Sequence, residues 1–211
     1  KIKDVILKRE IVFDIVHSHF SWPFGYAAAN ISKDFGCKSF LTIHENREWL
    51  LKEEQEKYVQ ETWQNLDGII RVNKIDLSLL KKYNENVVSI ANGYDHNKFA
   101  SFKAHEKNTE RGIDKNLLEF IKGKKILFTL SGLIKRKGIH DLLQAINILN
   151  NKRDDFVLLV GGSGPEKANL LRIIEKNKIN NCKLLGFLSD DEVLYWMQKC
   201  DLFVIPSYSE G

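Results

Sequence analysis

The sequence predicts an α/β protein made of two doubly wound units, each built on a parallel β-sheet. Two observations lead to this fold class. Short runs rich in Val, Ile, Leu and Phe lack polar alternation, which is typical of parallel strands covered on both faces. Between these runs lie segments whose apolar residues recur at helical spacing. Strands that alternate with helices are the pattern of a parallel sheet with helices packed against it.

The strand-like runs are short and are bounded by polar residues or glycine. They are Asp14–Val16, Phe40–Ile43, Gly68–Val72, Val87–Ile90, Ile126–Leu130, Phe156–Val160 and Leu202–Ile205. A helix is predicted for Tyr26–Phe35, with Gly36 ending it. A second is predicted where five apolar residues recur between Ile139 and Leu149. The helix before Cys200 begins with Ser189 and has Glu192 three residues later, which predicts a capping box.

One long polar segment interrupts this alternation. From Tyr94 to about Asn116 the chain is charged and shows no apolar periodicity. A connection of this length is uncommon inside a compact domain and indicates a domain boundary. We therefore predict one α/β unit over residues 1–105 and a second over residues 106–211.

The composition is that of a globular protein and argues against a nucleic-acid partner. Of the 211 residues, 43% are hydrophobic and 28% charged, which is enough apolar material for a core. The 32 basic and 28 acidic residues give a net charge of only +4, and it is spread along the chain. No clustered basic footprint for nucleic acid is present. A weak peripheral attraction to an anionic membrane surface stays open.

Cysteine usage and the start of the chain predict a cytoplasmic location. The three cysteines, Cys37, Cys182 and Cys200, are far apart, which favours a reducing compartment over a disulfide framework. The first ten residues are charged throughout, unlike a signal peptide, and no apolar run reaches the ~18 residues of a membrane span. The sequence also lacks zinc-ligand spacing, a Walker phosphate loop and a Gly-x-Ser-x-Gly elbow.

In the first unit, polar loops follow two predicted strands, at the sheet edge where parallel α/β proteins bind ligands. His17 and His19 follow the first strand; for His17 a buried, hydrogen-bonded ring is the preferred interpretation, whereas His19 is a candidate for the acceptor side of a site. His44 is the first residue after the next strand, so its ring should be held rigidly at this edge. Arg47 lies in the same polar cluster and is a second acceptor-side candidate.

In the second unit, the loop at residues 131–138 has the composition of an anion site. It carries three consecutive cations between Gly132 and Gly138. Arginine offers bidentate contacts to phosphate and lysine a mobile point charge. We expect Arg136 and Lys137 to bind phosphate, and Lys135 to be solvated.

Two further loops of this unit follow strands. The turn containing Gly162 and Gly164 does not match the dinucleotide-binding fingerprint, because Lys167 stands where that template requires glycine, so we expect a tight turn beside a ligand and no NAD site. Glu210 follows the last strand, one residue before the end of the sequence.

Taken in order, these loops resemble glycosyltransferase family 4, whose members have the GT-B fold of two Rossmann-like domains. The matching stretches are DIVHSHFSWPFGYAA, LTIHENREW, DGIIRVN, IANGYDHNKF, SGLIKRKG, VGGSGPE, LLGFLSDDEV and CDLFVIPSYSEG. The closest similarity is to enzymes that build polysaccharides such as teichuronic acid. The resemblance implies two facing domains, an N-terminal one for the acceptor and a C-terminal one for a nucleotide-diphosphate-sugar donor. It also implies transfer with retention of anomeric configuration, without a metal or other cofactor, onto a glycan, lipid-linked or small-molecule acceptor.

The resemblance also implies roles for single residues. Lys137 matches the family lysine on the donor diphosphate, and His44 the histidine near the donor sugar. Glu210 matches the first glutamate of the Glu-x7-Glu motif, which holds sugar hydroxyls. Gly186, Phe187 and Leu188 correspond to the region beside the nucleotide base, while Asn92, Gly93 and Asp95 match a turn with an expected structural role.

Two departures from the family pattern leave alternatives open. The family arginine five residues before the lysine falls on Gly132, so either Arg136 supplies the second cation or diphosphate binding is weaker. The pattern also implies a further strand before Lys1 and a second motif glutamate after Gly211. The alternatives are a sugar-nucleotide epimerase on the same fold and a non-catalytic protein that binds a nucleotide or glycan. The donor, the acceptor and any contact at the inner face of the membrane are not specified by the sequence.

Overall fold

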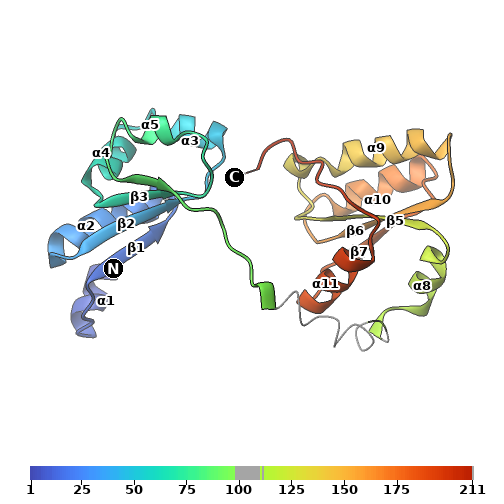
Figure 1. The fold of residues 1–211 in the computed structure, drawn as a ribbon, viewed down its shortest axis with the longest axis horizontal. Helices are drawn as coiled ribbons and strands as arrows, with labels where there is room; N and C mark the ends of the chain where they lie inside the picture. Colours follow the sequence, from blue (N-terminus) through green and yellow to red (C-terminus); the bar gives the residue numbers. More distant parts are fainter. Residues whose placement is uncertain (98–109, 111, 211) are drawn as a thin grey trace. The chain divides into compact units, whose positions relative to one another are not determined.

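The chain forms two compact units in a computed structural model that describes residues 1–97, 110 and 112–210 (Figure 1). The first unit comprises Lys1–Gly93 and the second Tyr94–Glu210. The boundary predicted after residue 105 lies outside the described residues.

The elements alternate between strand and helix for most of the chain. In the first unit they are α1 (Ile2–Lys8), β1 (Ile15–His19), α2 (Tyr26–Phe35), β2 (Lys38–Ile43), α3 (Arg47–Glu53), α4 (Lys57–Asn65), β3 (Gly68–Arg71), α5 (Leu77–Leu80) and β4 (Val87–Ser89). In the second unit they are α8 (Lys115–Ile121), β5 (Lys125–Leu130), α9 (Ile139–Asn150), β6 (Phe156–Gly161), α10 (Lys167–Lys176), β7 (Cys182–Gly186), α11 (Asp190–Lys199) and β8 (Leu202–Phe203).

The first unit has a four-stranded sheet in the order β1-β2-β3-β4, and every neighbouring pair is parallel. Because all four strands are parallel, the loops that follow them leave from the same edge of the sheet. This edge carries the residues between β1 and α2 and those between β2 and α3.

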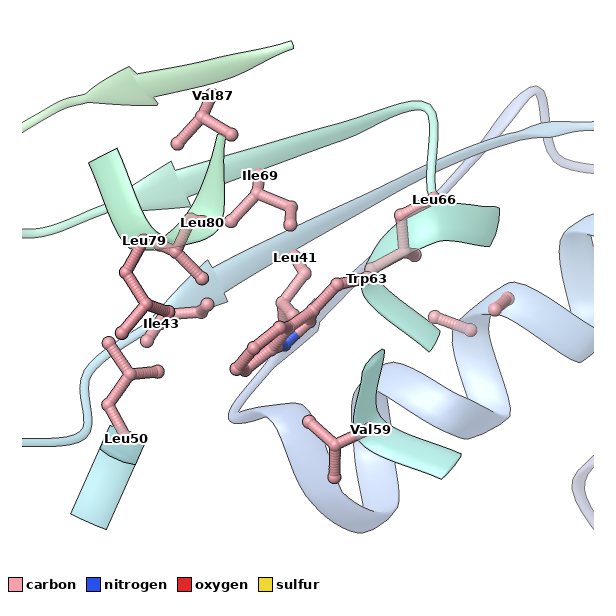
Figure 2. Close-up of a cluster of buried hydrophobic side chains, with 12 residues drawn as sticks. Leu41, Ile43, Leu50, Val59, Trp63, Leu66, Ile69, Leu79, Leu80 and Val87 are labelled. Atoms are coloured by element: carbon pink, nitrogen blue, oxygen red, sulfur yellow. The ribbon is translucent and has the colours of Figure 1, made fainter. Parts of the chain in front are cut away.

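The core of the first unit surrounds a fully buried tryptophan, Trp63 of α4 (Figure 2). Figure 2 shows its indole among apolar side chains of the sheet and of the neighbouring helices. Its indole nitrogen donates to the hydroxyl of Ser21 at 3.2 Å, so the buried polar atom is satisfied. Asn84 closes the same region, because its amide donates to the carbonyls of Trp63 and Leu66 at 2.9 and 2.7 Å.

The second unit has a four-stranded parallel sheet in the order β7-β6-β5-β8. All six residues of the central strand β6 are buried, as expected for a parallel strand with helices on both faces. One face packs against α9 and α10 and the other against α8 and α11, so two separate core clusters flank the sheet. The chain changes direction after β7, because β8 joins the sheet beside β5 on the far side from β6.

The predicted α/β class, with two parallel-sheet, Rossmann-like units, is confirmed. The capping box is present, since Ser189 and Glu192 bond each other's backbone amides at the start of α11. Helices α1, α3, α4, α5 and α8 and strand β7 were not among the predicted elements. Strand β7 contains Lys183 and has only one fully buried residue, so it lacks the apolar run that marks the other strands of this sheet.

Replacing Trp63 with alanine should destabilise the first unit by about 3–5 kcal/mol, because it removes the largest side chain of a fully packed core. Urea unfolding followed by far-UV circular dichroism measures the change. Trp49→Ala is the matched control, since Trp49 is 56% exposed and its loss should cost about 0.5 kcal/mol or less. Equal urea midpoints for Trp63→Ala and the wild type would show that this core assignment is wrong.

Candidate functional site

The edge of the second sheet has a topological switch point between β5 and β8. From β5 the chain continues to β6 on one side, whereas β8 lies on the other side. The loops that leave β5 and β8 therefore border a crevice at their carboxyl ends, which is where open α/β sheets bind ligands. Both predicted phosphate-binding cations and Glu210 are on these two loops.

The two loops are in direct backbone contact. Gly138, at the end of the basic turn, has φ +65°, and a Cβ atom there would lie 2.1 Å from the carbonyl oxygen of Pro206. Only glycine allows this approach. The amide of Tyr208 donates to the carbonyl of Arg136 at 3.0 Å, and the Arg136 guanidinium donates to the carbonyl of Ser209. The loop after β8 is thus fixed against the basic turn.

This contact brings Lys137 and Glu210 together, although they are 73 residues apart. The Lys137 ammonium lies 2.6 and 2.8 Å from the two carboxylate oxygens, and Arg136 lies 3.6 Å from one of them. The hydrogen bonds from Lys137 and Ser207 hold the pKa of Glu210 below its usual value, with smaller help from the charge of Arg136. The carboxylate is therefore ionised at neutral pH and occupies the position of an anion on these cations.

Tyr208 adds a second link between the loop after β8 and helix α9. Its hydroxyl donates to Asp141 at 2.8 Å, and this bond raises the pKa of Tyr208. Neither residue was predicted from the sequence as part of the site. Tyr208 and Asp141 are recognised as part of the site only once β8 is known to lie beside β5.

The glycine-rich loop after β6 supports the loop after β5 from the other side. Gly162 and Gly164 have φ of +119° and +157°, and a Cβ at either would overlap the carbonyl of Ser131 or Leu133. The amide of Leu133 donates to Ser163 at 2.8 Å, while the amide of Glu166 donates to Leu133 at 3.0 Å. The tight turn predicted at these glycines is present, and it shapes the phosphate-side loop.

Of the remaining residues predicted at the donor side, Gly132 and Phe187 are exposed and Leu188 is buried. A Cβ on Gly132 would meet no atom within 4 Å, so the backbone leaves room for a side chain there. Phe187, directly after β7, is 83% exposed at the same edge of the sheet. Leu188 instead is buried and packs in the core cluster beneath α11.

In the first unit, three histidines lie together at the ends of β1 and β2. His19 Nδ1 and His44 Nε2 are 2.7 Å apart, and their rings stack at 5.0 Å between centroids. The ring of His17 lies tilted beside that of His19, with 4.9 Å between centroids, and forms a 2.8 Å hydrogen bond with the hydroxyl of Thr42. The hydrogen bond predicted for His17 is present, but its side chain is exposed and not buried.

The surroundings of His17 and His44 favour the neutral form of these two rings. Partial burial and the neighbouring imidazoles lower the pKa of both His17 and His44. For His44 the carboxylate of Glu45 opposes this effect, and the charge of Arg71 adds to it. A 2.7 Å contact between two ring nitrogens requires that one donates and the other accepts, so the pair shares a single proton.

Glu45, the residue after His44, lies close to a second carboxyl group, that of Glu53. Glu45 is 7% exposed and accepts from the amide of Ser21 at 2.8 Å. Burial, followed by repulsion from Glu45, raises the pKa of Glu53 on α3 to about 7. The Oε2 atoms of both glutamates are buried without a hydrogen-bond partner, and a proton held between them would satisfy both.

Arg47, the second acceptor-side candidate, is held by an ion pair. Its guanidinium lies 3.0 Å from Asp76, whose side chain is only 3% exposed. Asp76 also approaches the fully buried Arg71, at 3.8 Å. Arg47 therefore links the start of α3 to the end of β3 and the loop that follows it.

The predicted residues thus lie in two groups, one in each unit. His19, His44 and Arg47 share the edge of the first sheet, and the second unit brings together Arg136, Lys137 and Glu210. Asn92 and Gly93 lie in the segment without regular structure after β4, where Asp95 accepts from the amide of Asn97 at 2.9 Å.

Neither a metal centre nor a membrane span is found in the part of the chain that the structure describes. Among residues 1–97, 110 and 112–210, no set of three or more His, Cys, Asp or Glu side chains is arranged to hold a metal ion. Within the same ranges no helix combines the length and the apolar character needed to cross a membrane.

Comparison with known proteins relates the chain to glycosyltransferases. Residues 110–211 match the family described as Glycosyl transferases group 1. An uncharacterised glycosyltransferase of Methanocaldococcus jannaschii is 27% identical over 213 residues, covering 100% of this chain and 54% of the relative. The putative teichuronic acid biosynthesis glycosyltransferase TuaC of Bacillus subtilis is 26% identical over 100% of this chain and 52% of its own length. The chain therefore spans about half the length of these relatives.

Solved structures of glycosyltransferases share the fold. The crystal structure of Anabaena Alr3699/HepE in complex with UDP has a TM-score of 0.74 at 17% identity, covering 98% of this chain and 56% of that one. The pneumococcal O-GlcNAc transferase GtfA in complex with UDP and GlcNAc has a TM-score of 0.70 at 16% identity, over 99% of this chain and 40% of that one. The GT-B class expected from the sequence is thereby confirmed.

Replacing Glu53 with glutamine should raise stability more at pH 8 than at pH 5. The pKa of Glu53 is about 7 in the folded state and about 4.5 in the unfolded chain. The stability that the wild type gains from protonated Glu53 is therefore fully present below pH 4.5 and is lost as the pH rises through 7. The glutamine cannot ionise, so the variant should gain about 1–2 kcal/mol over the wild type between pH 5 and pH 8, after allowance for solvent screening.

Urea unfolding at a series of pH values measures this gain. Glu48→Gln is the matched control on the same helix, because Glu48 is exposed and paired with Lys52, which lowers its pKa. Parallel stability profiles for the wild type and Glu53→Gln between pH 5 and pH 8 would contradict a shared proton in this carboxyl pair.

Proposed function

We propose that the protein is a glycosyltransferase that moves a sugar from a nucleotide-diphosphate donor to a glycan, lipid-linked or small-molecule acceptor in polysaccharide or cell-envelope synthesis. The observation that carries this proposal is the pair of cations, Arg136 and Lys137, held against Glu210 at the switch point of the second sheet. This arrangement offers positive charge for a diphosphate and a carboxylate for hydroxyl groups within one small site.

The chemistry needs these cations because negative charge grows on the departing diphosphate as the glycosidic bond breaks. Lys137 is only 19% exposed, so its charge acts through a medium less polarisable than bulk water. Preorganised donors of this kind each lower a barrier by about 3 kcal/mol. We propose that Lys137 and Arg136 stabilise the leaving group without a metal ion, and that transfer retains the anomeric configuration, as in family 4.

Glu210 has a matching role on the sugar. An ionised carboxylate accepts hydrogen bonds and does not donate them. Its oxygens accept from Lys137 at 2.6 and 2.8 Å. When a diphosphate takes over the lysine, the same oxygens become available to the hydroxyl groups of the donor sugar.

In the first unit we propose that His44 and His19 act together at the acceptor side. Their shared proton leaves one ring nitrogen on each residue for other partners. A neutral imidazole can donate to a sugar hydroxyl or accept from it, depending on its tautomer. Arg47 is fixed beside this pair by Asp76.

The relatives support the choice of donor and pathway. The structures of Anabaena Alr3699/HepE and pneumococcal GtfA are complexes with UDP, and TuaC is a putative teichuronic acid biosynthesis glycosyltransferase. A UDP-sugar is therefore the donor to test first.

A non-catalytic nucleotide- or glycan-binding protein is the second candidate. Gly132 favours it, because no cation stands at the position where the family has arginine. Transfer of the sugar, measured beside UDP binding, distinguishes these candidates.

Replacing Lys137 with alanine should weaken binding of UDP-sugars roughly 10- to 100-fold, because it removes a charge-assisted contact to the diphosphate. Isothermal titration calorimetry measures the affinity. Lys135→Ala is the matched control, since Lys135 is an exposed cation two residues away in the same turn and its loss should change affinity by about twofold or less. A folded wild-type protein that binds no nucleotide sugar would refute the transferase proposal.

Replacing Gly132 with arginine should strengthen UDP binding about tenfold, because the site has space for the side chain and would gain a third cation. If the protein is a transferase that relies on Arg136 alone, turnover should rise as well. Tighter UDP binding with no transfer in either protein would favour the non-catalytic candidate. Gly132→Gln, which adds bulk without charge, controls for the added side chain.

A further inference from the structure

A polar groove of about 410 Å³ lies between α2 and α4 in the first unit, and the proposed transfer reaction does not use it. Both helices pack into the same core cluster on one face of the sheet, and residues of both line the groove. The groove is separate from the histidine pair, but the loop between β1 and α2 connects the two regions.

Three partly exposed aromatic rings gather at one end of this groove. Trp22 contacts Tyr58 edge to face at 4.6 Å and Tyr26 at 5.4 Å. These rings are 47%, 40% and 46% exposed, respectively, although large aromatic side chains are usually well buried. Exposed aromatic side chains that cluster in this way mark binding surfaces, because each combines an apolar face with a polar tip.

Hydrogen-bonding side chains line the rest of the groove. The amides of Asn30 and Asn65 each donate to the carbonyl four residues earlier in their helix, at 2.8 and 2.6 Å. These bonds fix the amide orientation and leave the side-chain oxygens as acceptors. Glu61 adds a carboxylate and Lys33 an ammonium, so the lining has no excess of either charge.

We propose that this groove binds the sugar chain of a glycan acceptor, several residues away from the hydroxyl that receives the new sugar. The proposal rests on the proposed transfer to a glycan. A sugar ring presents apolar C–H faces, which suit the three aromatic rings, and a rim of hydroxyl groups, which suit amide and carboxylate oxygens. The balanced charge matches a neutral or weakly charged chain.

The position of the aromatic end supports this assignment. Tyr26 and Tyr58 lie in the first turns of α2 and α4, and Trp22 belongs to the loop that follows β1. In a parallel sheet the helix that follows one strand and the helix that precedes the next both have their N-terminal ends near the carboxyl edge. The aromatic end therefore lies at the edge that carries His19 and His44. From there the groove continues along α2, whose ten residues span about 15 Å, the length of roughly three sugar residues.

The same lining argues against a membrane surface as the occupant. Peripheral contact with anionic lipid relies on clustered cations beside apolar side chains. This groove is lined by one lysine, Lys33, one glutamate, Glu61, which pairs with Lys57 at 3.6 Å, and two amides.

Binding of glycans without any nucleotide sugar tests the proposal. The full protein is applied to an array of bacterial surface polysaccharides and their oligosaccharide fragments, and hits are titrated by calorimetry. Trp22→Ala and Tyr58→Ala should each weaken glycan binding at least tenfold, while Tyr58→Phe, which keeps the ring, stays within about threefold. Trp49→Ala, an exposed tryptophan outside the groove, should bind as the wild type does. Affinity should increase with oligosaccharide length until the groove is filled.

UDP affinity is measured on the same samples, so that failure of this inference is distinguishable from failure of the proposed function. Wild-type UDP affinity with lost glycan binding in the Trp22 and Tyr58 variants supports the groove. Absence of glycan binding by the wild type, or undiminished binding by both variants, overturns it even if UDP binds. Binding to phosphatidylcholine–phosphatidylglycerol vesicles that depends on Trp22, without glycan binding, would also overturn it in favour of a membrane contact. Glu61→Gln is a second test that leaves the aromatic cluster untouched. It should fold as the wild type does and bind glycan more weakly.

Discussion

The close approach of backbone to glycine at three loop positions is the constraint on which the second unit's site depends. Gly138 lies against the carbonyl of Pro206, and Gly162 against that of Ser131. Both contacts are so close that a Cβ atom on either glycine would overlap the carbonyl oxygen. Gly164 makes a similar approach to the loop after β5. These contacts join the loops after β5, β6 and β8 through rigid main chain. The cations and the carboxylate are therefore positioned by backbone rather than by flexible side chains alone.

The sequence predicted the parts of this site but not their arrangement. Arg136 and Lys137 could be chosen because cations between glycines follow a buried strand, and Glu210 because it follows another. Their contact depends on β8 lying next to β5, and nothing in the periodicity of the chain specifies that order. A strand order that reverses after β7 is a property of the tertiary fold. The same limit explains why Tyr208 and Asp141 were not predicted, since each is an ordinary polar residue until the two loops meet.

In the first unit, the sequence did not predict which polar side chains are buried. The polar run after β2 was expected to lie at a ligand-binding edge. Part of it is instead buried or helical. Glu45 points into the protein, and Arg47 begins a short helix, α3, that holds Glu53 beside it. Sequence patterns assign charged residues to the surface by default, because burying a charge is costly unless it is paired or neutralised. A proton held between Glu45 and Glu53 would remove that cost, and the sequence does not show which side chains lie close enough to hold one.

The ion pair with Glu210 supplies the positive charge of Lys137 with a counter-ion from the protein itself. Much of the positive charge at the switch point is neutralised before any ligand arrives, so a diphosphate enters by exchanging one anion for another. Such an exchange releases fewer solution ions than binding to bare cations would, and its affinity should therefore depend only weakly on salt. Long-range attraction of anions to the site is reduced for the same reason. The site then discriminates by fit to its cations and hydrogen bonds, and it resists occupation by the inorganic phosphate and other small anions that surround it in solution.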